Sequence, residues 1–213
     1  MGSVRGFLRF LLWFVLITAI VVGAARALAI RWFWVPDDLV MAASVAPTLH
    51  GGDLVILWRA TKPVYGDLVV CPEPDSDGWV VGRLLATEGD VIEVNGDRIL
   101  RNGKPTTTES ACGEFTIVDP ETENEVVMRC GVVVAAGRKF TIGEANGHKN
   151  VPRPIKDELM PGEVFLVSDN RLYPYDSRDY GAVMGNTCTE TVVFRLLGPG
   201  GWSESESRLT VIR

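Results

Sequence analysis

Several classes of function are excluded by what this sequence lacks. Its 21 Lys and Arg residues are outnumbered by 27 Asp and Glu, giving a net charge of −6. A nucleic-acid-binding face needs an excess of basic residues, so we expect no nucleic acid partner. The four cysteines include no Cys-x-x-Cys pair, which argues against a zinc site. Because the chain also has no glycine-rich phosphate loop and no ligand cluster, we expect no metal, nucleotide or flavin cofactor.

The few cysteines leave their own state open. Cys112 and Cys130 flank one segment and would either close a disulfide loop outside the cytoplasm or remain as buried free thiols. For Cys71 and Cys188 the sequence favours neither state.

A hydrophobic run occupies the N-terminus. Residues 10–25 carry no charge, and the apolar character continues past Arg26 to residue 30. About 20 apolar residues cross the hydrocarbon core, and this run reaches that length if Arg26 extends its charge to the interface. The Trp-Phe-Trp-Val stretch at 32–35 resembles an interfacial aromatic belt. We therefore predict a short tail and transmembrane anchor in residues 1–35, the alternative being a secretory signal cleaved near the alanines at 24–27.

Basic residues do not settle the orientation of this anchor. Arg5 and Arg9 precede the hydrophobic run, while Arg26 and Arg31 follow it. The positive-inside rule therefore barely discriminates between the two orientations.

Residues 36–213 are predicted to form one β-rich domain, because short apolar runs alternate with Gly, Pro, Asn and Asp turn signals and no internal repeat occurs. Asn95-Gly96 predicts a type I′ hairpin turn. Between residues 106 and 159 the sequence is mostly polar and hard to pattern. The predicted strands are 54–58, 68–70, 79–85, 91–94, 98–100, 132–134, 139–142, 164–167 and 191–197.

The motifs of the chain are organised around a serine that follows the predicted anchor. The stretch Ser44-Val45-Ala46-Pro47-Thr48-Leu49 leads to Gly51, Gly52 and Asp53. Pro47 biases Ala46 toward an extended conformation, so we expect Ser44 on a turn outside any helix, with its hydroxyl exposed. Taken alone, such a segment is a plain turn, and two further blocks give it meaning.

One block runs from Gly82-Arg83 to Gly89-Asp90, and the other contains Asp169-Asn170-Arg171 followed by Asp176-Ser177-Arg178. In this order after an N-terminal anchor, the three blocks resemble the signal peptidase I family of membrane-anchored serine endopeptidases. The resemblance implies coiled antiparallel β-sheets beside the membrane and an extracytoplasmic body. It also implies two partners, the signal peptides of exported or membrane proteins and the lipid bilayer. The implied site has Ser44 as nucleophile, with support from Arg83, Asp169, Arg171, Asp176, Ser177 and Arg178.

The chain departs from this family at the residue that would accept the proton of the serine hydroxyl. A serine hydroxyl is a poor nucleophile until a neighbouring base takes its proton, and the family supplies a lysine at the position of Gly82. Arg83 stays protonated and points to the opposite face of its strand. Ala42 and Pro174 stand where the family often has two further serines, one for the oxyanion and one that bonds the lysine.

Six other residues are candidates for the base: His50, His148, Lys62, Lys139, Lys149 and Lys156. His50 heads down the strand that follows Ser44, Lys62 precedes a turn at Pro63, and His148 with Lys149 lie in a Gly- and Asn-rich loop. Two hypotheses follow. Either the chain cleaves signal peptides with an unidentified base, or it is a catalytically impaired relative that binds signal peptides or regulates an active signal peptidase.

Overall fold

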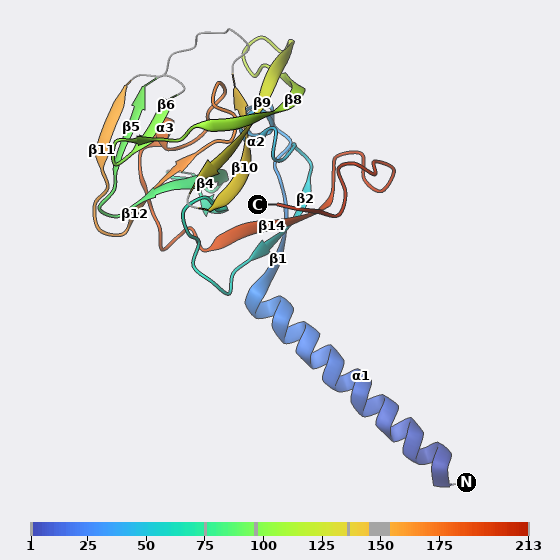
Figure 1. Ribbon diagram of the computed structural model, residues 1–213. Helices are drawn as coiled ribbons and strands as arrows, with labels where there is room; N and C mark the ends of the chain where they lie inside the picture. The colour runs from blue at the N-terminus through green and yellow to red at the C-terminus, as the bar shows by residue number, and fades with distance from the viewer. Residues whose placement is uncertain (1, 75, 96–97, 136, 145–153, 213) are drawn as a thin grey trace.

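The computed structural model describes residues 2–212 except 75, 96–97, 136 and 145–153. Helix α1 (Gly2–Ala29) projects as a single straight rod from a β-rich body, which it joins at β1 (Figure 1). Within the described chain, Gly6–Ala29 is the one helical segment long and apolar enough to cross a membrane. At 1.5 Å per residue these 24 residues extend about 36 Å, enough for a hydrocarbon core of about 30 Å.

The body is built on a curled antiparallel sheet of eight strands, in the order β1-β2-β14-β3-β4-β12-β13 with β15 paired to β14. The central strand β4 is buried from Val80 to Ala86, because apolar clusters cover both of its faces. The strands are β1 (Ile30–Trp34), β2 (Leu54–Trp58), β3 (Leu68–Pro72), β4 (Trp79–Thr87), β12 (Glu163–Val167), β13 (Val183–Met184), β14 (Glu190–Leu197) and β15 (Thr210–Val211).

Two smaller antiparallel sheets lie beyond the large one, in the orders β10-β9-β8 and β11-β5-β6-β7. The first contains β8 (Thr108–Val118), β9 (Glu125–Ala135) and β10 (Arg138–Glu144), and the second contains β5 (Val91–Asn95), β6 (Arg98–Arg101), β7 (Lys104–Pro105) and β11 (Ile155–Glu158). Every strand predicted from the sequence is present. The turn residue Gly96 lies outside the described residues.

Sequence patterning missed the short strands β1, β7, β11, β13 and β15, as well as the long strand β8 and the first half of β9. Nine of the eleven residues of β8 are exposed, so both of its faces meet solvent and no apolar alternation marks it. Its pairing with β9 and a disulfide between Cys112 and Cys130 hold it in the sheet instead.

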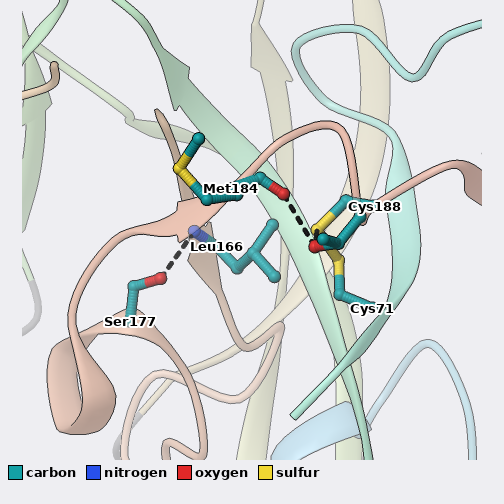
Figure 2. Close-up of a disulfide and its surroundings, with 6 residues drawn as sticks. Cys71, Leu166, Ser177, Met184 and Cys188 are labelled. Atoms are coloured by element: carbon teal, nitrogen blue, oxygen red, sulfur yellow. Dashed lines mark hydrogen bonds between the residues drawn. A yellow bond between two sulfur atoms is a disulfide. The ribbon is translucent and has the colours of Figure 1, made fainter. Parts of the chain in front are cut away.

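All four cysteines form disulfides, so the alternative of free thiols is wrong. Cys71 of β3 is bonded to Cys188, which lies just before β14. Figure 2 shows this disulfide beside Leu166 of β12, whose backbone N–H donates to Ser177 Oγ. The disulfide therefore joins β3 to the segment before β14, close to β12, the strand that faces Gly82.

A short helix, α2 (Leu39–Val45), carries Ser44, which corrects the expectation that this serine lies outside any helix. Asp38 begins α2 by accepting a hydrogen bond from the Met41 N–H at 2.9 Å. Pro47 restricts only the residue before it, and Ala46 is indeed extended, with φ −69° and ψ 147°. The helix therefore ends at Val45, one residue beyond the serine rather than before it.

Candidate functional site

Ser44 lies in the last turn of α2 and is fully buried. Its Oγ donates to the Met41 carbonyl at 2.9 Å and lies 3.8 Å from Met41 Sδ. The expected exposed hydroxyl is therefore wrong for this conformation. The hydroxyl proton is directed at a backbone oxygen of the same helix.

The loop after β12 contacts the backbone of Ser44 directly. Asn170 N donates to the Ser44 carbonyl at 3.0 Å, while Arg171 N donates to Gly143 O and Gly143 N donates to Asp169 O. These bonds join α2, the end of β10 and residues 169–171. The structure thus brings together the serine block and the Asp-Asn-Arg block, which are far apart in the sequence.

Arg83 and Asp169 form a fully buried ion pair within this arrangement. Arg83 Nε and Nη2 donate to the two carboxylate oxygens of Asp169, each at 2.7 Å, and Nη1 donates to Gly66 O at 2.7 Å. The guanidinium also stacks over Phe140, 4.3 Å from its ring centroid. Two parallel hydrogen bonds fix both direction and distance, so the pair anchors the loop to β4.

Asp176 and Arg178 form a second buried ion pair at the start of the short helix α3 (Ser177–Tyr180). Arg178 Nη2 lies 2.7 Å from Asp176 Oδ2, which also accepts from Ser168 N at 2.6 Å. Burial by itself raises the pKa of Asp176, but the charge and hydrogen bonds of Arg178 and the Ser168 N–H together hold it below its ordinary value. The carboxylate therefore stays ionised and braces the loop.

Gly82 lies on β4 opposite Val69 of β3 and faces β12. A Cβ placed there would lie 3.0 Å from Leu166 Cβ and 3.6 Å from Val167 N. Any larger side chain would therefore require β12 to shift by a few tenths of an ångström. The close packing fits glycine, and even a single added methyl group would press on Leu166 in this conformation.

Among the described residues, no Lys or His nitrogen hydrogen-bonds to Ser44 Oγ. His50 lies beside Asp53, with its Nδ1 4.0 Å from Asp53 Oδ2, and Lys156 Nζ pairs with Glu93 at 3.1 Å. Lys62 and Lys139 are exposed. His148 and Lys149 lie outside the described residues.

Arg171 differs from the other supporting residues because its charge lacks a close partner. It is buried, and its two Nη atoms make no hydrogen bond to the described residues. Burial, with the nearby charge of Arg178, lowers the pKa of Arg171 to about 10, so it stays protonated at neutral pH. It lines a hollow of about 350 Å³ together with Thr106, Thr108 and Glu144.

Sequence reasoning missed the pair that holds the turn after Ser44. Arg195 Nε lies 2.9 Å from Asp53 Oδ2, and Arg195 Nη2 donates to Thr48 O. Burial raises the pKa of Asp53, and the charge of Arg195 together with a hydrogen bond from His50 N at 2.9 Å offsets this only in part. In the sequence, the Gly52-Asp53 pair of the serine block pointed to Asp53. Its partner Arg195 could not be identified, because it lies far along the chain on β14.

Comparisons with known proteins identify the family of this chain. The family described as "Signal peptidase, peptidase S26" matches residues 10–197. Signal peptidase I of Bacillus licheniformis is 28% identical over 167 residues, covering 76% of each chain. Signal peptidase I of Streptococcus pneumoniae is 24% identical over 206 residues, covering 92% of this chain and 96% of that one.

A crystal structure of a signal peptidase I from Enterococcus faecalis is also similar, with 21% identity and a TM-score of 0.37, covering 62% of this chain and 97% of that one. The family match extends over most of the chain, from the anchor helix to the end of β14. This chain therefore belongs to the signal peptidase family, peptidase S26, and has a signal peptidase I-like function.

Proposed function

We propose that this chain is a membrane-anchored serine endopeptidase that removes signal peptides from exported precursors, with Ser44 as nucleophile. The observation that carries the proposal is the hydrogen bond from Asn170 N to Ser44 O. It holds the serine against a loop that two buried ion pairs, Arg83–Asp169 and Asp176–Arg178, keep rigid. A nucleophile needs such support to be held at attack distance from a scissile carbonyl.

Two things must change before Ser44 attacks. Its Oγ must leave the Met41 carbonyl, and a base must accept its proton. We place His148 and Lys149 first as candidates for this base, because the other basic residues considered lie beside other partners or are exposed. Attack then forms the acyl bond to Ser44 as the amine of the mature protein leaves with a proton, and water releases the signal peptide.

The proposal is tested with the purified full-length protein in detergent and an internally quenched signal-peptide substrate. The expected result is cleavage by the wild type and loss of at least about 10³-fold in kcat/KM for Ser44→Ala. His148→Ala and Lys149→Ala identify the base, since the variant lacking it loses comparable activity. Equal activity of the wild type and Ser44→Ala would refute the assignment of the nucleophile.

A second candidate function is binding of signal peptides without cleavage, or regulation of an active signal peptidase. The specific observation that favours it is Gly82, packed against Leu166 where the family has its lysine. In this case the wild type and Ser44→Ala are equally inert but bind the same peptide equally well. Gly82→Lys then gains activity, whereas Gly82→Ala, which adds only the Cβ, does not.

We also propose that the body faces the extracytoplasmic side. The two disulfides support this orientation, because disulfides persist in oxidising compartments and are rare in the cytosol. The test is protease treatment of intact spheroplasts carrying the full chain. Digestion of the body without lysis is expected, and complete protection would contradict this orientation.

A further inference from the structure

Three arginines surround a shallow hollow where α1 meets the body. Arg26 lies in the last turn of α1, Arg31 lies on β1, and Arg59 directly follows β2. Together with Trp32 they line a hollow of about 470 Å³. Figure 1 shows that this junction is where the projecting helix enters the sheet.

The junction has an excess of positive charge although the whole chain has a net charge of −6. One carboxylate, Glu190, partly balances the three guanidinium groups. It lies 2.8 Å from Arg31 Nη1 and 4.0 Å from Arg59 Nε. Arg59 Nε makes no hydrogen bond to the described residues, so Glu190 balances the charge of Arg59 only at 4.0 Å.

The arginines are held in place by contacts within the protein. Arg59 N donates to Ala29 O at 2.9 Å and Arg59 Nη2 donates to Ala27 O at 3.0 Å, which ties the end of α1 to the end of β2. The Arg26 guanidinium lies 3.9 Å from the centroid of the Trp32 ring. A cluster positioned in this way loses less side-chain entropy when it binds a ligand.

The position of the hollow determines which anion reaches it. The apolar span ends at Ala29, so Arg26, Arg31 and Arg59 fall at the level of the lipid headgroups on the side of the body. Trp32 is half exposed at the same level, where tryptophan favours the membrane interface. Guanidinium groups bind phosphate oxygens in paired, directional hydrogen bonds.

We propose that Arg26, Arg31, Arg59 and Trp32 form a binding site for the phosphate of an anionic phospholipid headgroup. A headgroup fits better than free phosphate because the hollow also offers the apolar surfaces of Ile30 and the Trp32 ring beside the charges. The bound lipid braces α1 against β1 and β2 and so fixes the height of the body above the bilayer. This inference does not depend on whether Ser44 cleaves a substrate.

The test uses the full-length protein in detergent micelles, titrated with phosphatidylglycerol or phosphatidylcholine and followed by native mass spectrometry. Phosphatidylglycerol is expected to bind more tightly than phosphatidylcholine. Each neutralised arginine should weaken it about fivefold, so Arg26→Gln with Arg59→Gln should weaken it about 25-fold. Arg26→Lys, which keeps the charge, should restore most of the affinity lost in Arg26→Gln.

Arg9→Gln is the matched control, since it removes the same charge from an exposed position at the other end of α1. It should leave this affinity within twofold of the wild type. Equal binding of both lipids, wild-type affinity of the double variant, or an equal loss in Arg9→Gln would overturn the proposal. Displacement of the lipid by millimolar inorganic phosphate would also overturn it, by identifying a free-anion site. If the double variant fails to fold, Arg26→Gln alone decides between these outcomes.

Discussion

The ion pair between Arg83 and Asp169 offers the sharpest test of how the site is supported. Both side chains are fully buried, and two hydrogen bonds of 2.7 Å join them. In Asp169→Ala, Arg83 retains its bond to Gly66 O but loses the carboxylate that balances its charge. Breaking a buried pair by removing one partner costs about 3–5 kcal/mol of unfolding free energy.

That cost is large for a domain of this size. Domains are typically stable by about 5–15 kcal/mol, and each kcal/mol shifts the Tm of a domain of 150–250 residues by about 2–4 °C. Asp169→Ala should therefore lower the Tm by roughly 6–20 °C, measured by circular dichroism in detergent without reductant. Arg83→Met combined with Asp169→Leu, which removes both charges, should recover most of this loss.

The exposed pair between Lys156 and Glu93 provides the control. Its side chains are 72% and 36% exposed, and a pair of this kind contributes about 0–1 kcal/mol. Glu93→Gln should therefore shift the Tm by no more than a few degrees. If Asp169→Ala behaves like Glu93→Gln, the buried pair does not stabilise the loop and the reasoning is refuted.

Three further predictions concern the same body. The pKa of Asp176 lies below its ordinary value of 3.8, so this carboxylate contributes stability that is present above that value and lost as the pH falls below it. Asp176→Asn should therefore lower the urea midpoint of unfolding at neutral pH and make that midpoint fall less steeply toward about pH 3. An unchanged acid dependence would contradict this. The disulfide Cys71–Cys188 closes a span of 117 residues, and Cys112–Cys130 closes one of 18. Replacing the first pair by alanine should therefore lower the free energy of unfolding by about 5 kcal/mol, and replacing the second pair should lower it by about 3 kcal/mol. The reverse order in denaturant titrations would contradict the explanation by loop entropy. Gly82→Ala should cost about 1–3 kcal/mol because its Cβ meets Leu166 Cβ at 3.0 Å, and a Tm equal to or above the wild type would show that β12 yields freely.

The scaffold around Ser44 and the base that would activate its hydroxyl pose two separate questions in this chain. The two ion pairs expected to support Ser44, Arg83–Asp169 and Asp176–Arg178, are both buried. Gly82 carries no side chain that could accept a proton, and a Cβ placed there would lie 3.0 Å from Leu166 Cβ. Family membership rests on the family match over residues 10–197, while turnover depends on which base reaches Ser44 Oγ.

Much of the fold was predictable because its signals are local. The apolar run of α1 and the predicted strands of the large sheet arise from neighbouring residues, and each strand is present near its predicted bounds. The polar strand β8 was not predictable in this way, since its exposed residues carry no pattern and only pairing with β9 specifies it. The helical position of Ser44 was not predictable from Pro47, because this proline constrains Ala46 directly and leaves the helix free to continue through Val45.

By itself, the sequence determined the anchor, the β-rich class and the family, because hydrophobic length, alternation and the order of short motifs are properties of the linear chain. Only the tertiary structure decided that Ser44 is buried on a helix, that Asn170 contacts its carbonyl, and that all four cysteines are paired. It alone also gathered Arg26, Arg31 and Arg59 at one junction. These features depend on residues that are distant in the chain, and their distances are set by how the strands pair.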